Sequence, residues 1–332
     1  MNSPVVVVGM HRSGTSLVSR ILDQSGVMMG KDLQEDHESL FFIGLNEWIY
    51  ENAGASWERP AILSELTEHE QAMEAVNEYI SKRLSSRGSK AYSGRYLKKG
   101  LFDMDGMWGW KDPRNGPTLP VWKSIWPEMK IVHVTRHGVD VASSLKTRNS
   151  SHWEGDVSRF KKWLPTYSWR SSRSPIMRGQ RSSTMEGALG FWSEQVEMEK
   201  GILSDIGDKH SIRYEDLLSD PKEAISKLYE YLSIQAEPQT ISSIEGMIDP
   251  SRAFAYRKDP ELSEFSSSKS DILARHGYSA SLFRLMRGYN TPITRRPSKR
   301  LIKCTFWSYH AQLSPMVSGA LRGSARTCAR DS

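Results

Sequence analysis

The first residues able to do chemistry lie in a glycine loop near the start of the chain. Gly9 and Gly14 are separated by four residues and followed by Thr15 and Ser16, which gives the pattern G-x4-G-T-S. Successive backbone amides in such a loop form a concave nest of donors, and the N-terminus of a following helix adds about half a positive charge. The pattern therefore predicts a phosphate-binding loop. The ATP-binding version has a lysine where Thr15 stands, so the sequence argues against ordinary NTP hydrolysis.

A second pair of candidates, an arginine and a serine, lies in the middle of the chain. Arg136 follows a predicted strand over 130–135, and Ser144 comes eight residues later, inside the next predicted helix. A guanidinium at a strand end and a hydroxyl in the following helix can hold one phosphate from two sides. Without their context, the same two residues would be read as a surface arginine and a helix serine.

The elements that must position these residues alternate between strand and helix. Val5–Val8 is a β-branched run typical of a strand buried on both faces. Apolar spacing predicts helices over Thr15–Gln24 and over about 39–53, 66–86, 139–145, 186–204 and 221–232, with further strands at about 108–111, 130–135 and 210–214. This alternation predicts an α/β fold: a P-loop-like three-layer α/β/α arrangement around a central, mostly parallel sheet.

Charge divides the chain into a near-neutral body and a basic end. The 332 residues carry a net charge of +6, of which residues 291–332 contribute eight Lys or Arg and one Asp. We therefore predict a domain over 1–290 and a flexible basic tail over 291–332. A body without net positive charge argues against nucleic-acid binding. The tail, with apolar Phe306 and Trp307, could make weak contact with an anionic membrane surface.

Together the motifs resemble those of the sulfotransferases that use 3′-phosphoadenosine 5′-phosphosulfate (PAPS), especially the bacterial and carbohydrate-type members. Val8–Leu17 is similar to the family's loop for the 5′-phosphosulfate, and Val134–Leu145 to its element for the 3′-phosphate. Trp110–Arg114 is similar to a lysine-bearing segment, and Ile212–Pro221 to the block that reads Y-E-D-L. The resemblance covers about residues 4–235.

This resemblance implies which residues hold the donor. They are Gly9, Arg12, Ser13, Gly14, Thr15 and Ser16 at the 5′-phosphosulfate, Arg136 and Ser144 at the 3′-phosphate, Tyr214 near the adenine, and Arg257 in a C-terminal Arg-Lys. Two departures weaken the last assignments. Leu17 and Val18 stand where many members have an adenine-stacking tryptophan, and Asp259 replaces the glycine that follows the Arg-Lys pair.

The resemblance also implies in-line transfer of a sulfuryl group, with cations placed where negative charge develops. It assigns Arg12 to the phosphosulfate and Lys111 to the bridging or sulfuryl oxygens. Asp112 follows Lys111 where small-molecule members have a histidine base, so the search for a base moves to Glu38, eight residues before Asn46 as in bacterial members. His37 and Glu35 are rival bases, and a solvated acidic loop is the alternative interpretation.

The acceptor is predicted from composition alone. The stretch at about 146–185 holds nine Lys or Arg, two acids and three tryptophans, which are Trp153, Trp163 and Trp169. Tryptophan faces stack on sugar rings and arginines suit acidic groups, so we expect a carbohydrate or glycoconjugate acceptor. A mobile loop whose tryptophans fold onto the core is the competing interpretation. A lipid-linked sugar, a small metabolite and a peptide tyrosine also remain open.

Two other functions are open at this point. A P-loop kinase or NTPase would use the same loop, although Thr15 replaces its lysine and no acidic strand end suits magnesium. A nucleotide-binding scaffold without turnover would keep the fold alone. Scattered histidines predict no metal site. Two cysteines, Cys304 and Cys328, fit a reducing compartment, and the absence of a long apolar stretch fits a cytoplasmic enzyme. Oligomeric state is left open.

Overall fold

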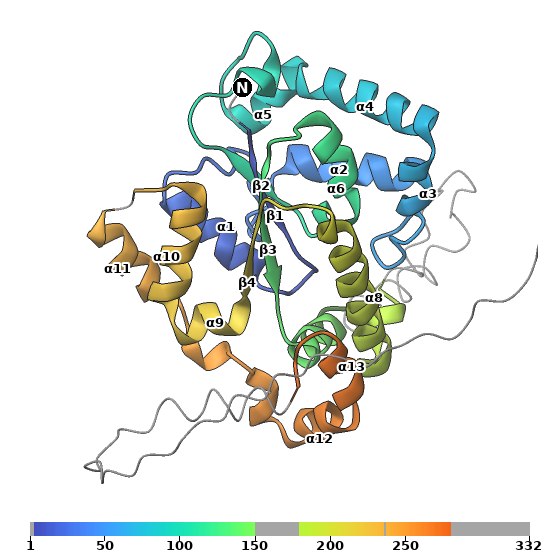
Figure 1. The fold of residues 1–332 in the computed structure, drawn as a ribbon, viewed down its shortest axis with the longest axis vertical. Coiled ribbons are helices and arrows are strands. Elements are labelled where there is room, and N and C mark those ends of the chain that lie inside the picture. Colours follow the sequence, from blue (N-terminus) through green and yellow to red (C-terminus); the bar gives the residue numbers. More distant parts are fainter. Residues whose placement is uncertain (1–2, 150–178, 236, 280–332) are drawn as a thin grey trace, which may run out of the picture. The chain divides into compact units, whose positions relative to one another are not determined.

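The computed structural model describes residues 3–149, 179–235 and 237–279, and Figure 1 shows how their elements are arranged. A four-stranded sheet of order β2-β1-β3-β4 lies at the centre. The strands are β1 (Val5–Val8), β2 (Gly109–Lys111), β3 (Lys130–Thr135) and β4 (Lys209–Arg213). All three pairings between neighbours are parallel. Their carboxyl ends therefore lie at one edge of the sheet.

Alternate valines of β1 face opposite layers of helices. Val6 and Val8 belong to one apolar cluster, and Val5 and Val7 to another. The helices of the first layer are α2 (Leu40–Asn52), α3 (Leu63–Glu68), α4 (Glu70–Leu84), α5 (Lys90–Ser93) and α6 (Asn115–Ile125). The helices of the second are α1 (Thr15–Gln24), α9 (Tyr214–Ser219), α10 (Pro221–Leu232) and α11 (Pro238–Gly246). The predicted α/β fold class, with its parallel sheet between helices, is confirmed.

A third apolar cluster forms beyond the carboxyl ends of the strands, where orange and olive helices gather in Figure 1. It is built by a helix over 138–149, by α8 (Met185–Ser204), α12 (Pro260–Ser268) and α13 (Ser270–Arg275), and by the turn Ala255–Lys258. Met10 of the loop after β1 packs into this cluster. The loop is therefore held between the sheet and these helices.

Local sequence explains why several predicted bounds are right. Helix α10 begins at Pro221, whose missing N–H is no loss in a first turn, and Asp220 caps it by accepting a hydrogen bond from the Glu223 amide. The single helix predicted over 66–86 is wrong. His69 is extended (φ −99°, ψ 100°) and its side chain accepts a hydrogen bond from the Ala72 amide, so α3 ends there and α4 begins.

Several predictions fall on residues outside this description. They concern the tryptophans Trp153, Trp163 and Trp169 and the basic tail over 291–332. In the part of the chain that is described, no helix is long and apolar enough to cross a membrane.

Candidate active site

The loop between β1 and α1 has the sharp backbone turns that a nest of amides requires. Arg12 has a φ of 67° and Gly14 a φ of 98°, both in the left-handed region. Ser13 donates its backbone N–H and its hydroxyl to the carbonyl of Met10, at 3.1 Å and 2.6 Å. A left-handed arginine is costly, and such backbone strain persists where the surrounding structure enforces it, often at functional sites.

The two predicted phosphate elements meet at the carboxyl ends of β1 and β3. Arg12 donates from Nε to the Ser144 hydroxyl at 2.8 Å, and Arg136 donates from Nη1 to the Arg12 carbonyl at 3.1 Å. Strand β1 lies between β2 and β3, and the chain passes from β2 to the far side of β1. Such a switch in strand order is where open α/β sheets bind their ligands.

Arg136 combines burial with an unused donor. Its side chain is 11% exposed, its guanidinium lies 4.6 Å from the centre of the Tyr214 ring, and its Nη2 lies 4.0 Å from Asp140. Its Nε is buried and has no hydrogen-bond partner among the residues that the structure describes. A buried donor left without a partner is rare, and an anion bound at this corner would accept its hydrogen bond.

Tyr214 and Arg257 both reach the same corner. The Tyr214 ring packs against Gly14, where an added Cβ would lie 2.2 Å from the ring. Arg257 lies in the turn Ala255–Lys258, with its guanidinium 4.2 Å from the Phe254 ring. Together with burial, the charges of Arg257, Arg213 and Arg136 lower the pKa of His137 to about 3. Several cations therefore surround the start of the helix over 138–149.

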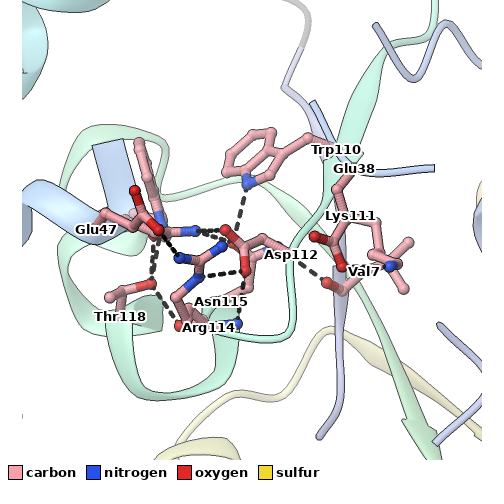
Figure 2. A network of polar contacts seen from close by, with 11 residues as sticks. Val7, Glu38, Glu47, Trp110, Lys111, Asp112, Arg114, Asn115 and Thr118 are labelled. Atoms are coloured by element: carbon pink, nitrogen blue, oxygen red, sulfur yellow. Dashed lines mark hydrogen bonds and ion pairs between the residues drawn. The ribbon is translucent and has the colours of Figure 1, made fainter. Parts of the chain in front are cut away.

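Lys111 and Glu38 form an ion pair at the end of β2, shown in Figure 2. Lys111 Nζ lies 2.7 Å from Glu38 Oε1, and the two side chains are 2% and 16% exposed. Burial raises the pKa of Glu38, and the charge of Lys111 acts against that rise. The structure thus brings together the predicted base and the predicted catalytic lysine.

A buried polar network fixes the turn that directly follows Lys111 (Figure 2). Asn46 donates to Asp112 Oδ2 at 3.0 Å and to Asn115 Oδ1 at 2.9 Å. Asn115 in turn donates to the carbonyl of Val7 at 3.0 Å, which ties the network to β1. Asp112 also accepts from Arg114 at 2.9 Å, so the turn after Lys111 is fixed on both sides. The sequence analysis used Asn46 only as a spacing mark and missed this role.

The rival bases are held elsewhere. His37 Nε2 lies 3.3 Å from the Asp23 carboxylate on α1, and burial lowers the pKa of its ring. Glu35 is exposed, and its backbone carbonyl accepts a hydrogen bond from Arg20 at 2.8 Å. Of the three candidates, Glu38 is the one that forms an ion pair with Lys111, and a base has to lie beside the cations that act on the same reaction.

The residues on either side of 150–178 are tied to Glu58, another residue that the sequence analysis missed. The buried Glu58 carboxylate accepts from the amides of Gly179 and Ser182, at 3.1 Å and 3.0 Å, and from the Ser182 hydroxyl. Asn149 donates to that hydroxyl at 2.6 Å. These contacts hold Asn149, the last described residue of the helix over 138–149, and that helix also carries Ser144.

A metal centre has no basis in the described ranges. There, no three His, Cys, Asp or Glu side chains gather as a metal site would require. Asp112 does follow a strand directly, but its carboxylate is bonded to Arg114 and Asn46.

A family model described as "Sulfotransferase family" matches residues 4–238. The chain belongs to the sulfotransferase family. The resemblance of the motifs is thereby confirmed at the level of the family. A comparison with curated proteins found no match.

Solved structures similar to this sulfotransferase include three domains or proteins of low identity. The sulfotransferase domain from the curacin biosynthetic pathway is 16% identical, with a TM-score of 0.41 over 81% of this chain and 98% of that one. The sulfotransferase STF1 from Mycobacterium tuberculosis is 14% identical, with a TM-score of 0.39 over 74% of this chain and 71% of that one. The sulfotransferase domain of the Synechococcus olefin synthase is 16% identical, with a TM-score of 0.39 over 77% of this chain and 89% of that one. The family assignment rests on the sequence match.

Proposed function

We propose that this sulfotransferase transfers a sulfuryl group from PAPS to an acceptor hydroxyl or amine, with carbohydrate or glycoconjugate as the preferred acceptor class. The observation that carries the proposal is the meeting of Arg12, Ser144 and Arg136 at the carboxyl ends of β1 and β3. One nucleotide with phosphate groups at both ends of its ribose would use the loop and the arginine–serine pair at once. ATP has no 3′-phosphate for the second element.

The chain's donor residues divide between the two ends of the nucleotide. The loop amides with Arg12, Ser13, Thr15 and Ser16 would bind the 5′-phosphosulfate, helped by the positive end of α1. The second end, the 3′-phosphate, is assigned to Arg136, with Ser144 and the nearby Arg257. Buried Arg136 Nε, which has no partner in the described part of the chain, would gain one. Tyr214 is assigned to the adenine side.

Transfer forms a bond between the acceptor oxygen and sulfur and breaks the bond between sulfur and the 5′-phosphate oxygen. The acceptor loses its proton, for which Glu38 is our proposed base. Burial raises the pKa of Glu38 toward neutral pH, and a base is most effective when its pKa lies near the working pH. Lys111 has three N–H donors, of which one is used by Glu38, so others can stabilise charge on the sulfuryl or bridging oxygens.

The preference for carbohydrate rests on the basic, tryptophan-containing sequence around 146–185. Arg148 belongs to this stretch and is described by the structure. Its guanidinium carbon lies 5.2 Å from the centre of the Trp57 ring. Aromatic faces and guanidinium groups are the chemistry that binds acidic sugars. A cytoplasmic location remains a proposal from composition alone.

The experiment is a transfer assay with radiolabelled PAPS. Purified chain is offered neutral and acidic oligosaccharides, simple phenols and tyrosine peptides, with Lys111→Met as the low-activity control. We expect label on oligosaccharides and little with the control. Transfer to phenols alone would overturn the acceptor class. Absence of transfer to every acceptor by a chain that binds the donor's product would favour a scaffold without turnover.

A further inference from the structure

His11 lies in the middle of the glycine loop and packs against one aromatic wall. Its ring is edge-on to that of Trp57, with centres 5.1 Å apart and planes at 69°. Trp57 is itself edge-on to Phe191 of α8 at 5.6 Å. As far as the structure describes the chain, ring contacts and not a hydrogen bond hold the imidazole next to Arg12.

Within the described ranges, the two ring nitrogens of His11 have no polar partner from the protein. Among the described residues, none gives it a hydrogen bond or ion pair, whereas His133 and His276 both have polar partners. His133 contacts Glu199 at 3.2 Å, and His276 contacts the Ser193 hydroxyl at 2.7 Å. His11 is half-buried, and a neutral imidazole carries one donor and one acceptor nitrogen. His11 is thus placed for a partner that the chain does not supply.

Positive charge reaches His11 from several neighbouring elements. Burial, and then the charges of Arg148, Arg114, Lys111 and Arg12, hold the pKa of its ring well below 6.5. These cations belong to the helix over 138–149, to the end of β2 and its turn, and to the loop itself. Glu58 follows Trp57, but its carboxylate is bonded to Gly179 and Ser182. A partner for the imidazole in such surroundings is expected to be an anion.

We propose that His11 is a further catalytic residue, which hydrogen-bonds the 5′-phosphosulfate of the donor beside Arg12. This inference rests on the proposed function. When the sulfur–oxygen bond breaks, its electron pair goes to the bridging oxygen of the 5′-phosphate, while the acceptor's proton goes to Glu38. The His11 N–H donates a hydrogen bond to the phosphosulfate and stabilises that developing charge.

A measurable consequence is proton uptake on binding. The bound anion offsets the surrounding positive charge, so the pKa of His11 rises toward its ordinary value. A group whose pKa is higher in the complex takes up a proton when the ligand binds. Affinity then strengthens as pH falls through that higher pKa, and by linkage the effect disappears when the imidazole is removed.

The test is calorimetric titration with 3′,5′-adenosine bisphosphate at pH 6.5, repeated in two buffers of different ionisation enthalpy. The ligand's own phosphates titrate near this pH, so the contribution of His11 is the difference between the wild type and His11→Gln. We expect wild type to take up more protons, by up to about half a proton per ligand, because at pH 6.5 a histidine with its ordinary pKa is half protonated. His11→Gln should bind about tenfold more weakly.

Two further variants make the result decisive. His11→Phe keeps a ring against Trp57 but has no N–H, so it should bind at least as weakly as His11→Gln and take up no extra proton. His210→Gln changes a histidine on β4 that stacks on Tyr231, and should match wild type. Wild-type proton uptake and affinity in His11→Gln would overturn the inference and leave the donor assignment standing. A wild-type chain that does not bind the bisphosphate would overturn both.

Discussion

Glu38 and Lys111 are 73 positions apart, yet their side chains form a buried ion pair. Removing two charges from water is costly, and an ion pair in a protein interior is weak evidence for a gain in stability. Such a pair is better explained by chemistry. The carboxylate can accept a proton there, and the ammonium can stabilise negative charge a few ångströms away.

We predict that Glu38→Gln lowers turnover about 10²–10⁴-fold, because it removes a general base without changing the shape of the side chain. The raised pKa of Glu38 also predicts where activity is lost in the wild type. As pH falls through that raised value, the carboxylate is protonated, so the acid limb of the rate profile lies above the ordinary glutamate range. Rates with labelled PAPS across pH measure both effects.

Glu35→Gln is the matched control, since Glu35 is exposed and three residues away. It should keep the wild-type rate, and both variants should bind adenosine bisphosphate as wild type does. A wild-type rate in Glu38→Gln would move the base to another residue, and His37 would be examined next.

At this scale the sequence indicated the charged residues but not what supports them. Motif order was enough to propose Arg12, Lys111, Arg136 and Ser144. Asn46 could not be recognised as the centre of a network, because its partners come from α6 and the turn after β2. His11 lies between the two glycines of the loop pattern, but only the folded chain shows that its ring lacks a polar partner among the described residues.

Between elements, the close contact of the glycine loop with the start of α9 governs the shape of the site. Gly14 has a φ of 98°, and Tyr214 fills the space where a side chain would lie. Gly26, after α1, has a similar φ of 88° but nothing within 4 Å of an added Cβ. A substitution at Gly26 therefore tests the cost of the left-handed backbone alone, whereas one at Gly14 adds a clash with the Tyr214 ring.

We predict that Gly26→Ala lowers the free energy of unfolding by about 1–2 kcal/mol, the cost of a left-handed alanine. Gly14→Ala should cost more, because the Tyr214 ring must also move, and it should weaken binding of adenosine bisphosphate. Urea unfolding and calorimetry measure the two quantities. Equal free energies of unfolding and unchanged ligand affinity in both variants would show that the Gly14–Tyr214 contact does not shape the loop.

Sequence pattern predicted the elements better than their boundaries within helical regions. The four-valine strand and α10 were clear, because a β-branched run and an Asp-Pro start are strong local signals. The break at His69 was not, since apolar spacing continues from α3 into α4 and the capping role of a histidine has little sequence signal. Strand order also needs contacts between distant segments.

Across the whole molecule, segments far apart in sequence meet around His137. Its ring stacks on Tyr256 at 4.3 Å, and its backbone N–H donates to the buried Glu215 carboxylate at 2.8 Å. The ring also accepts from the Val139 amide at 3.3 Å, which caps the helix over 138–149. Neutral His137 therefore links three parts of the fold.

We predict that this histidine makes the fold sensitive to acid. Its pKa is about 3 in the folded chain, so below about pH 6.5 the unfolded chain binds a proton that the folded chain does not. The contribution of neutral His137 to the free energy of unfolding is fully present above pH 6.5. It is lost as pH falls from 6.5 toward 3. At pH 5.5 the loss due to His137 is about 1.4 kcal/mol.

The comparison is urea unfolding of wild type and His137→Asn at pH 7.5 and 5.5. Asparagine can still cap the helix but does not titrate. The variant should lose about 1.4 kcal/mol less than wild type between the two pH values. The raised pKa of Glu215 is common to both proteins and cancels. An identical drop in both proteins would contradict the assignment.

The central claim is that one nucleotide is held at its 5′ and 3′ phosphates by segments that follow β1 and β3. Titration of the chain with 3′,5′-adenosine bisphosphate, and separately with ATP and magnesium, tests it most directly. We predict strong binding of the bisphosphate, weak binding of ATP, and bisphosphate binding at least about tenfold weaker in Arg136→Ala, which loses a charge-assisted contact. Preference for ATP, or unchanged affinity in Arg136→Ala, would contradict the account.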